Sequence, residues 1–188
     1  TIYEANGKIG DMAPIIRQMV PGKKICGQAI TVRCFPSDMT AVLRALNLAM
    51  PGDIIVIDGG GTDRSTVWGG TSTRAAINVG IGGVVTNSGC RDIDEIIELG
   101  FPVYATGTCV RGTVKNHLGW VNIPISVGGI CVNPGDLVVG DRDGIVVVAE
   151  NQIAKTAESI IKQISLEQDK IERVESGEKL TEIFGIKN

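Results

Sequence analysis

The chain has 188 residues and a formal net charge of −3, with 43% hydrophobic and 21% charged residues. This length suits one ordinary domain with a substantial core, and this composition excludes a disordered chain. The negative charge disfavours nucleic-acid binding, and no apolar run approaches the roughly 20 residues of a membrane span. Glycine is the outlier, since its 25 residues are about twice the usual share of about 7%.

The cysteines and the single histidine argue against a zinc cluster and against disulfides. The five cysteines are Cys26, Cys34, Cys90, Cys109 and Cys131, and no pair has C-x-x-C spacing. With His117 as the only histidine, a Cys/His zinc site is excluded. An odd count without a signal-peptide pattern favours reduced, mostly buried thiols in a cytoplasmic protein. His117 lies in a loop-like stretch, so we expect it at the surface or at an interface.

Strand and helix patterns alternate in the first half of the chain. In chain order we expect the strand 30–35, the helix 40–49, the strand 54–57, the helix 73–79, the strand 82–86, the helix 93–99 and the strand 103–105. Ser37 or Asp38 is the expected N-cap of the first helix. The run 54–57 is continuously apolar, which is typical of a strand covered on both faces. This alternation predicts parallel strands joined by right-handed crossovers.

The second half of the chain predicts a β-rich layer followed by a long helix. The expected strands are 121–127, 130–132, 137–139 and 145–148, and the helix runs from Asn151 to about Glu175. Asp141–Gly144 begins like a calcium loop, but Gln152 stands where the loop needs Glu, so we expect a hairpin turn. Glu167 interrupts an apolar stripe along the helix. We expect one domain over 1–150 and a helical extension over 151–188 that packs on it or on a neighbouring subunit.

Two strand-to-helix turns carry the candidate chemistry. Gly69-Gly70-Thr71-Ser72 offers free backbone N–H groups at a helix start, which suit a carboxylate or phosphate. The alternative interpretation is a plain loop with a Thr or Ser cap. Gly59-Gly60-Gly61 lacks the G-x-G-x-x-G spacing, and no P-loop motif occurs, so dinucleotide and P-loop sites are excluded.

Arg91-Asp92 occupies the equivalent turn of the next unit, at the carboxyl end of a buried strand, where open α/β sheets bind ligands. The alternative interpretation is a capping arrangement of Asp92 with Glu95, which leaves Arg91 solvated. Taken together, the two turns suit a small anionic substrate beside a hard cation. No lysine lies in either turn, which disfavours a Schiff-base aldolase.

These motifs resemble those of a known family, which contains the regulator of ribonuclease activity A and the metal-dependent 4-hydroxy-4-methyl-2-oxoglutarate aldolases. The segments that carry the resemblance are Gly27–Arg33, Pro51-Gly52-Asp53, Gly69-Gly70, Gly89-Cys90-Arg91-Asp92, and Pro134-Gly135-Asp136 through Asp143-Gly144. They cover roughly residues 3–150 in the family's order. The resemblance implies an α/β fold of the swivelling β/β/α type, assembled as trimers.

The resemblance also implies roles for single residues. Arg91 would bind the pyruvoyl part of the substrate, and Asp92 would anchor Mg²⁺ or Mn²⁺ largely through waters. The backbone of residues 69–72 would form the substrate loop, and Glu167 is the candidate for a glutamate supplied by a neighbouring subunit. The aldolases carry a carboxylate at the position of Gly70, whereas the ribonuclease regulators carry glycine there.

The expected function is therefore a divalent-metal lyase that cleaves small 2-oxo dicarboxylic acids, by retro-aldol cleavage to pyruvate or by oxaloacetate decarboxylation. Both reactions need the same enolate stabilisation. The alternative is a non-catalytic protein that binds and restrains a ribonuclease. Gly70 favours the alternative, and Arg91 with Asp92 favours the lyase. A menaquinone-precursor methyltransferase is disfavoured, because no glycine-rich cofactor motif is followed by an acidic ribose partner.

Overall fold

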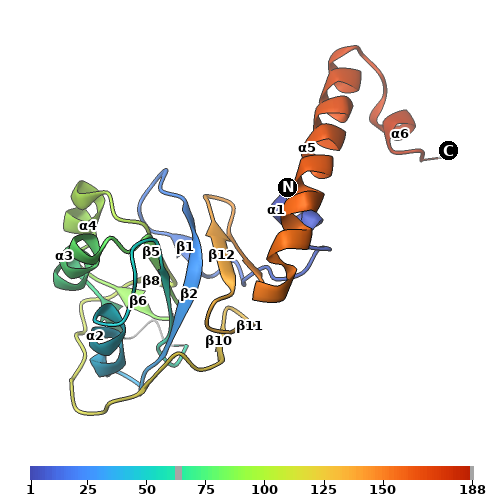
Figure 1. Ribbon diagram of the computed structural model, residues 1–188. Coiled ribbons are helices and arrows are strands. Elements are labelled where there is room, and N and C mark those ends of the chain that lie inside the picture. Colours follow the sequence, from blue (N-terminus) through green and yellow to red (C-terminus); the bar gives the residue numbers. More distant parts are fainter. Residues whose placement is uncertain (62–64, 187–188) are drawn as a thin grey trace. The chain divides into compact units, whose positions relative to one another are not determined.

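The structure is a computed structural model that describes residues 1–61 and 65–186. The chain forms two compact units, one of residues 10–150 and one of residues 1–9 with the segment that begins at Asn151. The larger unit has a mixed α/β fold with helices on one face of a sheet and further strands on the other (Figure 1). This confirms the fold class expected from the sequence.

The central sheet contains four parallel strands in the order β7 (Val103–Ala105), β5 (Gly83–Thr86), β3 (Ile54–Asp58) and β2 (Ile25–Arg33). The predicted parallel pairing is therefore confirmed. The short strand β1 (Arg17–Gln18) adds antiparallel to β7, and β9 (Trp120–Val121) adds antiparallel to β2.

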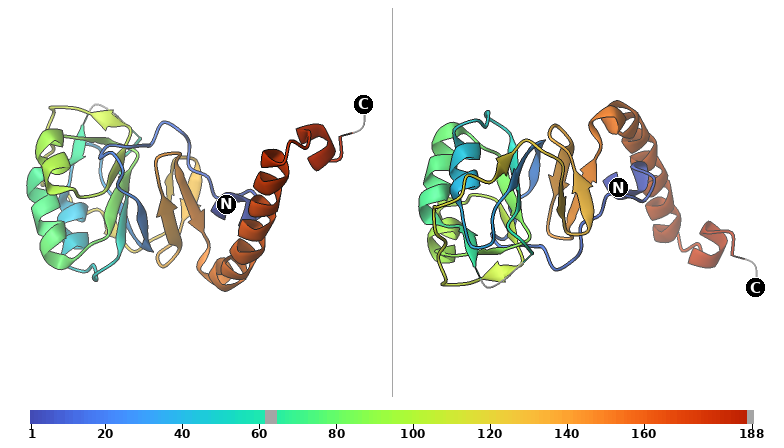
Figure 2. Two further views of the ribbon diagram at one scale, coloured as in Figure 1. Left: turned by 90° about the horizontal axis from the view of Figure 1, so that it is seen from above. Right: turned by 90° about the horizontal axis from the view of Figure 1, so that it is seen from below.

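Three helices cover one face of this sheet, namely α2 (Thr40–Leu46), α3 (Gly70–Val79) and α4 (Ile93–Leu99) (Figure 2). The first is shorter than predicted, because the chain leaves the helix in a turn at Asn47. The second begins three residues earlier than predicted. We expected Gly70 to lie in a loop before the helix. The first turn of a helix tolerates glycine, because the N–H groups of that turn have no partner within the helix.

The other face carries β10 (Ile125–Val127), β11 (Ile130–Val132), β12 (Leu137–Gly140) and β13 (Ile145–Val148) (Figure 2). β12 pairs antiparallel with β2, and the turn between β12 and β13 is the predicted hairpin. The predicted strand 121–127 is wrong as one element. It splits into β9 and β10, because Asn122 has a positive φ of 56° and Pro124 has no N–H to donate.

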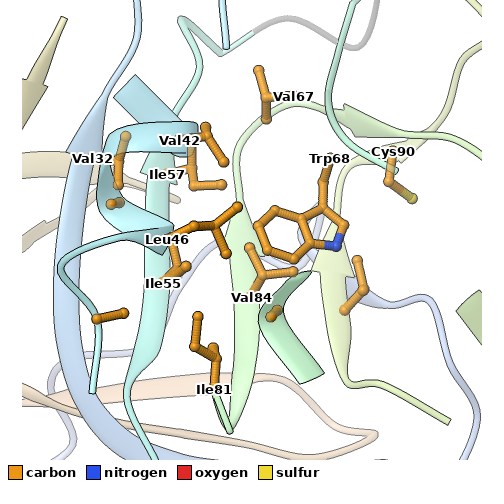
Figure 3. Packing of buried hydrophobic residues seen from close by; sticks show 14 of the residues in the cluster. Val32, Val42, Leu46, Ile55, Ile57, Val67, Trp68, Ile81, Val84 and Cys90 are labelled. Atoms are coloured by element: carbon orange, nitrogen blue, oxygen red, sulfur yellow. The ribbon is translucent and has the colours of Figure 1, made fainter. Parts of the chain in front are cut away.

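Strand β3 lies between two apolar clusters. Ile55 and Ile57 pack in the cluster beneath the helices, which Figure 3 shows from close by. Ile54 and Val56 pack in the cluster against β10–β13. All four side chains are fully buried, as the continuous apolar run predicted.

A second sheet, of three strands, lies directly before the two candidate turns. It consists of the parallel strands β4 (Thr66–Trp68), β6 (Gly89–Cys90) and β8 (Gly107–Thr108). Trp68 pairs with Cys90 and Cys90 with Thr108. Because the three strands run in parallel and in register, their three carboxyl-terminal exits lie next to one another.

The smaller unit contains α1 (Ile2–Ala5), α5 (Ile153–Glu175) and α6 (Leu180–Ile183), with a 3-10 turn at Glu150–Gln152 before α5. Helix α1 packs on α5. The apolar stripe is largely uncovered, since Ile164, Ile171 and Val174 are 44–55% exposed. No helix in the described part of the chain is long and apolar enough to cross a membrane.

Candidate functional site

A cavity of about 240 Å³ opens beside the exits of the three-stranded sheet. The sequence-predicted residues that line it are Gly69, Thr71, Ser72, Arg91 and Asp92. The Gly-rich turn follows β4 and the Arg-Asp turn follows β6, so the Trp68–Cys90 pairing sets the two turns side by side. From the sequence we expected Arg91-Asp92 to follow the strand 82–86. In the structure the short strand β6 lies between that strand and Arg91.

Asp92 joins the two turns directly. The backbone N–H of Arg91 donates to the carbonyl of Trp68, and the Gly70 N–H donates to Asp92 Oδ2 at 3.1 Å. Asp92 makes no side-chain cap bond to α4, and Glu95 pairs instead with Arg74 at 2.7 Å. The predicted capping alternative is therefore wrong, because the Asp92 carboxylate is turned to the start of α3.

Asp92 also has an unusual backbone. Its φ is +58° and its ψ is +39°, in the left-handed region that few residues other than glycine adopt. Aspartate tolerates this region better than most residues, and such conformations concentrate at functional sites. The left-handed turn ends β6 and starts α4 within one residue.

The Arg91 side chain extends along the cavity wall. Its Nε lies 3.6 Å from Asp92 Oδ2, and the two side chains are 50% and 44% exposed. At its far end, a Cβ added to Gly112 would lie 3.0 Å from Arg91 Nη1. The guanidinium therefore lies between Asp92 and the segment that follows β8.

Lys115 is the functional candidate that the sequence did not reveal. It lines the cavity from the segment after β8, together with Gly112 and Thr113. Neither turn contains a lysine, but the cavity wall does, because it includes this third segment. The sequence signal is weak, because only the register of β6 with β8 brings the third exit to the other two.

Apart from Thr66, the rest of the described cavity wall is apolar. Met39 and Leu43 line it from the start and middle of α2, and Ala75 lines it from α3. Leu46, Val67 and Trp68 also line it and belong to the buried cluster of Figure 3. The Trp68 indole N–H donates to the Thr73 hydroxyl at 2.9 Å, which fixes the ring against α3.

The two glycines of the first turn serve different purposes. A Cβ at Gly69 would lie 2.9 Å from Asp92 Oδ2 and 3.2 Å from Arg91 Cγ, so any side chain there would displace the Arg-Asp turn. A Cβ at Gly70 would lie 2.2 Å from the Glu95 carboxylate. Gly70 does not line the cavity, and the Glu95 carboxylate occupies the space of its missing side chain.

The residues fit a hard divalent cation held mainly by water. Across residues 1–61 and 65–186, no cluster of three or more His, Cys, Asp or Glu side chains could hold a metal ion. Asp92 offers one half-exposed carboxylate to the cavity, and Mg²⁺ keeps several waters and needs only one or two carboxylates. An oxygen donor suits Mg²⁺ or Mn²⁺ better than zinc.

Glu167 belongs to the smaller unit. Its carboxylate accepts hydrogen bonds from Gln163 Nε2 at 3.1 Å and from the Thr1 hydroxyl at 2.8 Å. These two bonds hold the pKa of Glu167 below its ordinary value. Its role in a neighbouring subunit's site stays a prediction.

The cysteines contribute no reactive thiol to the cavity wall. Burial raises the pKa of Cys90 to about 11 and that of Cys34 to about 12, so both remain protonated thiols. The expectation that most cysteines are buried is wrong, because Cys26 and Cys131 are exposed on strands and Cys109 is half-buried.

The comparison with protein families decides the relationship. A family model described as RraA-like, Aldolase/RraA, matches residues 1–147. The chain belongs to the RraA-like family. The resemblance drawn from the sequence motifs is thereby confirmed.

Proteins similar to this chain carry different names. A protein of Halalkalibacterium halodurans named "Putative 4-hydroxy-4-methyl-2-oxoglutarate aldolase" is 36% identical over 151 residues, which cover 80% of this chain and 72% of that protein. The solved RNA-processing inhibitor RraA of Thermus thermophilus is 28% identical, with a TM-score of 0.68 over 73% of this chain and 84% of that one. An uncharacterised protein of Pseudomonas syringae is 30% identical, with a TM-score of 0.87 over 99% of this chain and 88% of that one.

Proposed function

We propose that the protein is a divalent-metal-dependent lyase that cleaves small 2-oxo dicarboxylic acids to pyruvate, by retro-aldol cleavage or by oxaloacetate decarboxylation. The observation that carries the proposal is the meeting of Arg91, Asp92 and the start of α3 at one cavity. Arg91 and Lys115 are cationic and Asp92 is anionic, which suits an anionic substrate beside a cation.

The first-turn N–H groups of Thr71 and Ser72 lack partners within α3, both residues line the cavity, and these groups would bind a substrate carboxylate. Both reactions break the C3–C4 bond of the 2-oxo acid, and its electron pair becomes the enolate of pyruvate. The other product is carbon dioxide in the decarboxylation and a second 2-oxo acid in the retro-aldol cleavage, where the 4-hydroxyl group loses its proton to water. Protonation of the enolate at C3 then gives pyruvate. The Arg91 guanidinium would stabilise the charge that develops on the enolate oxygen. A divalent cation held at Asp92 would supply Lewis-acid polarisation of the 2-oxo acid when bound.

Assembly is part of the proposal. We expect a trimer in which Glu167 approaches the site of a neighbouring subunit. Supporting this, the smaller unit leaves large apolar side chains exposed, namely Ile161, Ile164, Leu166, Ile171 and Val174. Large exposed apolar side chains in such numbers mark contact sites between proteins.

One observation favours the second candidate function, a non-catalytic inhibitor of a ribonuclease. Position 70 is glycine, as the resemblance implies for the regulators, and the nearby Glu95 carboxylate is held by Arg74. Under this alternative the Arg-Asp turn would be retained without turnover.

Pyruvate release tests the proposal. Purified protein should release pyruvate from oxaloacetate and from 4-hydroxy-4-methyl-2-oxoglutarate with Mg²⁺ or Mn²⁺, and a chelator should abolish the release reversibly. Borohydride with pyruvate should label no lysine, Lys115 included. A folded protein that binds Mg²⁺ and releases no pyruvate from either substrate would favour the inhibitor function. Borohydride trapping on Lys115 would replace the metal mechanism by a Schiff base.

A further inference from the structure

A buried carboxylate stands between α2 and the segment that carries Lys115. Asp38 is 1% exposed. Its Oδ1 accepts hydrogen bonds from the Thr40 N–H at 2.8 Å and from the Thr40 hydroxyl at 2.7 Å. Its Oδ2 accepts from the N–H groups of Asn116 at 2.8 Å and His117 at 2.9 Å, and lies 3.1 Å from His117 Nδ1. Oδ1 therefore bonds to the start of α2, and Oδ2 bonds to the segment that follows Lys115.

Backbone bonds strengthen the same junction. The Met39 N–H donates to the carbonyl of Val114 at 3.1 Å, and the Val114 N–H donates to the carbonyl of Ser37 at 2.9 Å. Val114 and Asn116 flank Lys115, so both neighbours of the lysine are anchored to the start of α2. The lysine side chain itself is exposed and lines the cavity.

Among residues 1–61 and 65–186, the Lys115 ammonium has no carboxylate oxygen within 4 Å, whereas Arg91 has Asp92 beside it. The charged residues that line the cavity in these ranges are Arg91, Asp92 and Lys115. A monocarboxylate bound by Arg91 and the start of α3 would leave the lysine unpaired, whereas a second carboxylate would pair with it.

We propose that Lys115 binds the distal carboxylate of the substrate and so selects dicarboxylates, and that Asp38 is the positioning residue that holds it at the cavity wall. This inference rests on the proposed function for the identity of the 2-oxo acid. The apolar side chains of Met39 and Leu43 would then face the carbon chain between the two carboxylates.

The lysine is tested by ligand selectivity. Binding of 2-oxoglutarate and of 2-oxopentanoate, which has the same chain length and one carboxylate, is measured by calorimetry with Mg²⁺ present. K115M should lose about tenfold or more in affinity for 2-oxoglutarate, the size expected for a charged hydrogen bond, and keep its affinity for 2-oxopentanoate. K24M, at an exposed lysine outside the cavity, should bind both like the parent. An equal change for both ligands, or no change, would overturn the role of Lys115.

Asp38 is tested by coupling. D38N cannot accept bonds on both sides, so it should reproduce the selectivity loss of K115M, and D38N/K115M should be no worse than K115M alone. T40V loses one bond to Oδ1 but keeps the bonds to Oδ2, so it should lower the melting temperature without changing selectivity. H117A removes only the ring contact with Asp38 and should therefore lose part of the selectivity for 2-oxoglutarate that D38N loses. If D38N does not fold, H117A still tests the role of Asp38. Parent selectivity in both D38N and H117A would overturn the positioning role.

The two proposals fail in different ways. A selectivity loss in K115M without pyruvate release would support the binding site and remove the lyase. Pyruvate release with unchanged selectivity in K115M would support the lyase and remove the role of the lysine.

Discussion

Asp92 combines a left-handed backbone with a carboxylate that bonds the first turn of α3. We predict that Asp92→Asn abolishes metal-dependent pyruvate release but keeps the fold, because Asn tolerates positive φ. Asp92→Ala should lose the same activity and about 1 kcal/mol more stability, since alanine is strained there. Urea unfolding and pyruvate release with and without Mg²⁺ measure both effects. Retained, Mg²⁺-dependent turnover in Asp92→Asn would contradict a metal role for this carboxylate.

Arg91 is half-exposed, and its ion pair in the described structure is with Asp92. We predict that Arg91→Ala changes the unfolding free energy by less than about 0.5 kcal/mol, as for other surface sites. Pyruvate release should fall by about 10²–10³-fold, the usual loss when a donor to a developing oxyanion is removed. Arg74→Ala is the matched control, because Arg74 pairs with Glu95 outside the cavity. Equal losses in the two variants would assign the effect to surface charge.

At the scale of elements, the junction of α3 with α4 controls what position 70 can hold. We predict that Gly70→Asp raises the aldol-cleavage rate more in combination with Glu95→Ala than alone. Alone, the new carboxylate meets the Glu95 carboxylate, whose oxygen lies 2.2 Å from the added Cβ. Positioned general-base help is worth about 10²–10⁴-fold. Steady-state rates for the single and double variants decide this, and a gain in Gly70→Asp that Glu95→Ala does not increase would remove the role of Glu95.

The junction of α2 with the 114–117 segment should show in the pH dependence of stability. Burial by itself raises the pKa of Asp38, but the bonds from Thr40, Asn116 and His117 hold that pKa well below its ordinary value of 3.8. A lowered folded-state pKa stabilises the protein above pH about 4, and this stabilisation is lost as the pH falls further. Asp38→Asn should therefore lower the free energy of unfolding by about 1–3 kcal/mol at pH 7, and its difference from the parent should become smaller below pH 4. A difference in unfolding free energy that stays constant down to pH 2.5 in urea titrations would contradict this.

At the scale of the whole molecule, the prediction concerns assembly. Light scattering should give a trimer, and Ile171→Asp should weaken it, because the substitution puts a charge on the exposed apolar stripe. Arg91→Ala and Glu167→Gln should each lose most of the activity alone. Co-expressed, they should recover part of the activity, because some sites then combine Arg91 from one subunit with Glu167 from another. No recovery in a mixed trimer would place Glu167 outside the site.

The amino-acid sequence alone determined most of the longer elements and the two turns. Local patterns carry that information, since the apolar run 54–57 and the cap-to-glycine span 93–99 need no distant partner to be recognised. The sequence also brought the Gly-rich turn and Arg91-Asp92 together correctly as neighbours at a sheet edge. It placed that edge on the central sheet, however, because strands of two or three residues such as β6 give no periodic signal.

Only the tertiary structure decided which other groups reach the site. Lys115 lies 24 positions after Arg91 in the chain. It reaches the cavity because β8 follows β6 in register, because Asp38 binds the N–H groups of Asn116 and His117, and because backbone bonds hold Val114 to the start of α2. The Glu95 carboxylate fills the space at Gly70 because α3 and α4 pack side by side. Both contacts depend on long-range register and helix packing, and the sequence pattern around each residue is the same whether or not its distant partner is present.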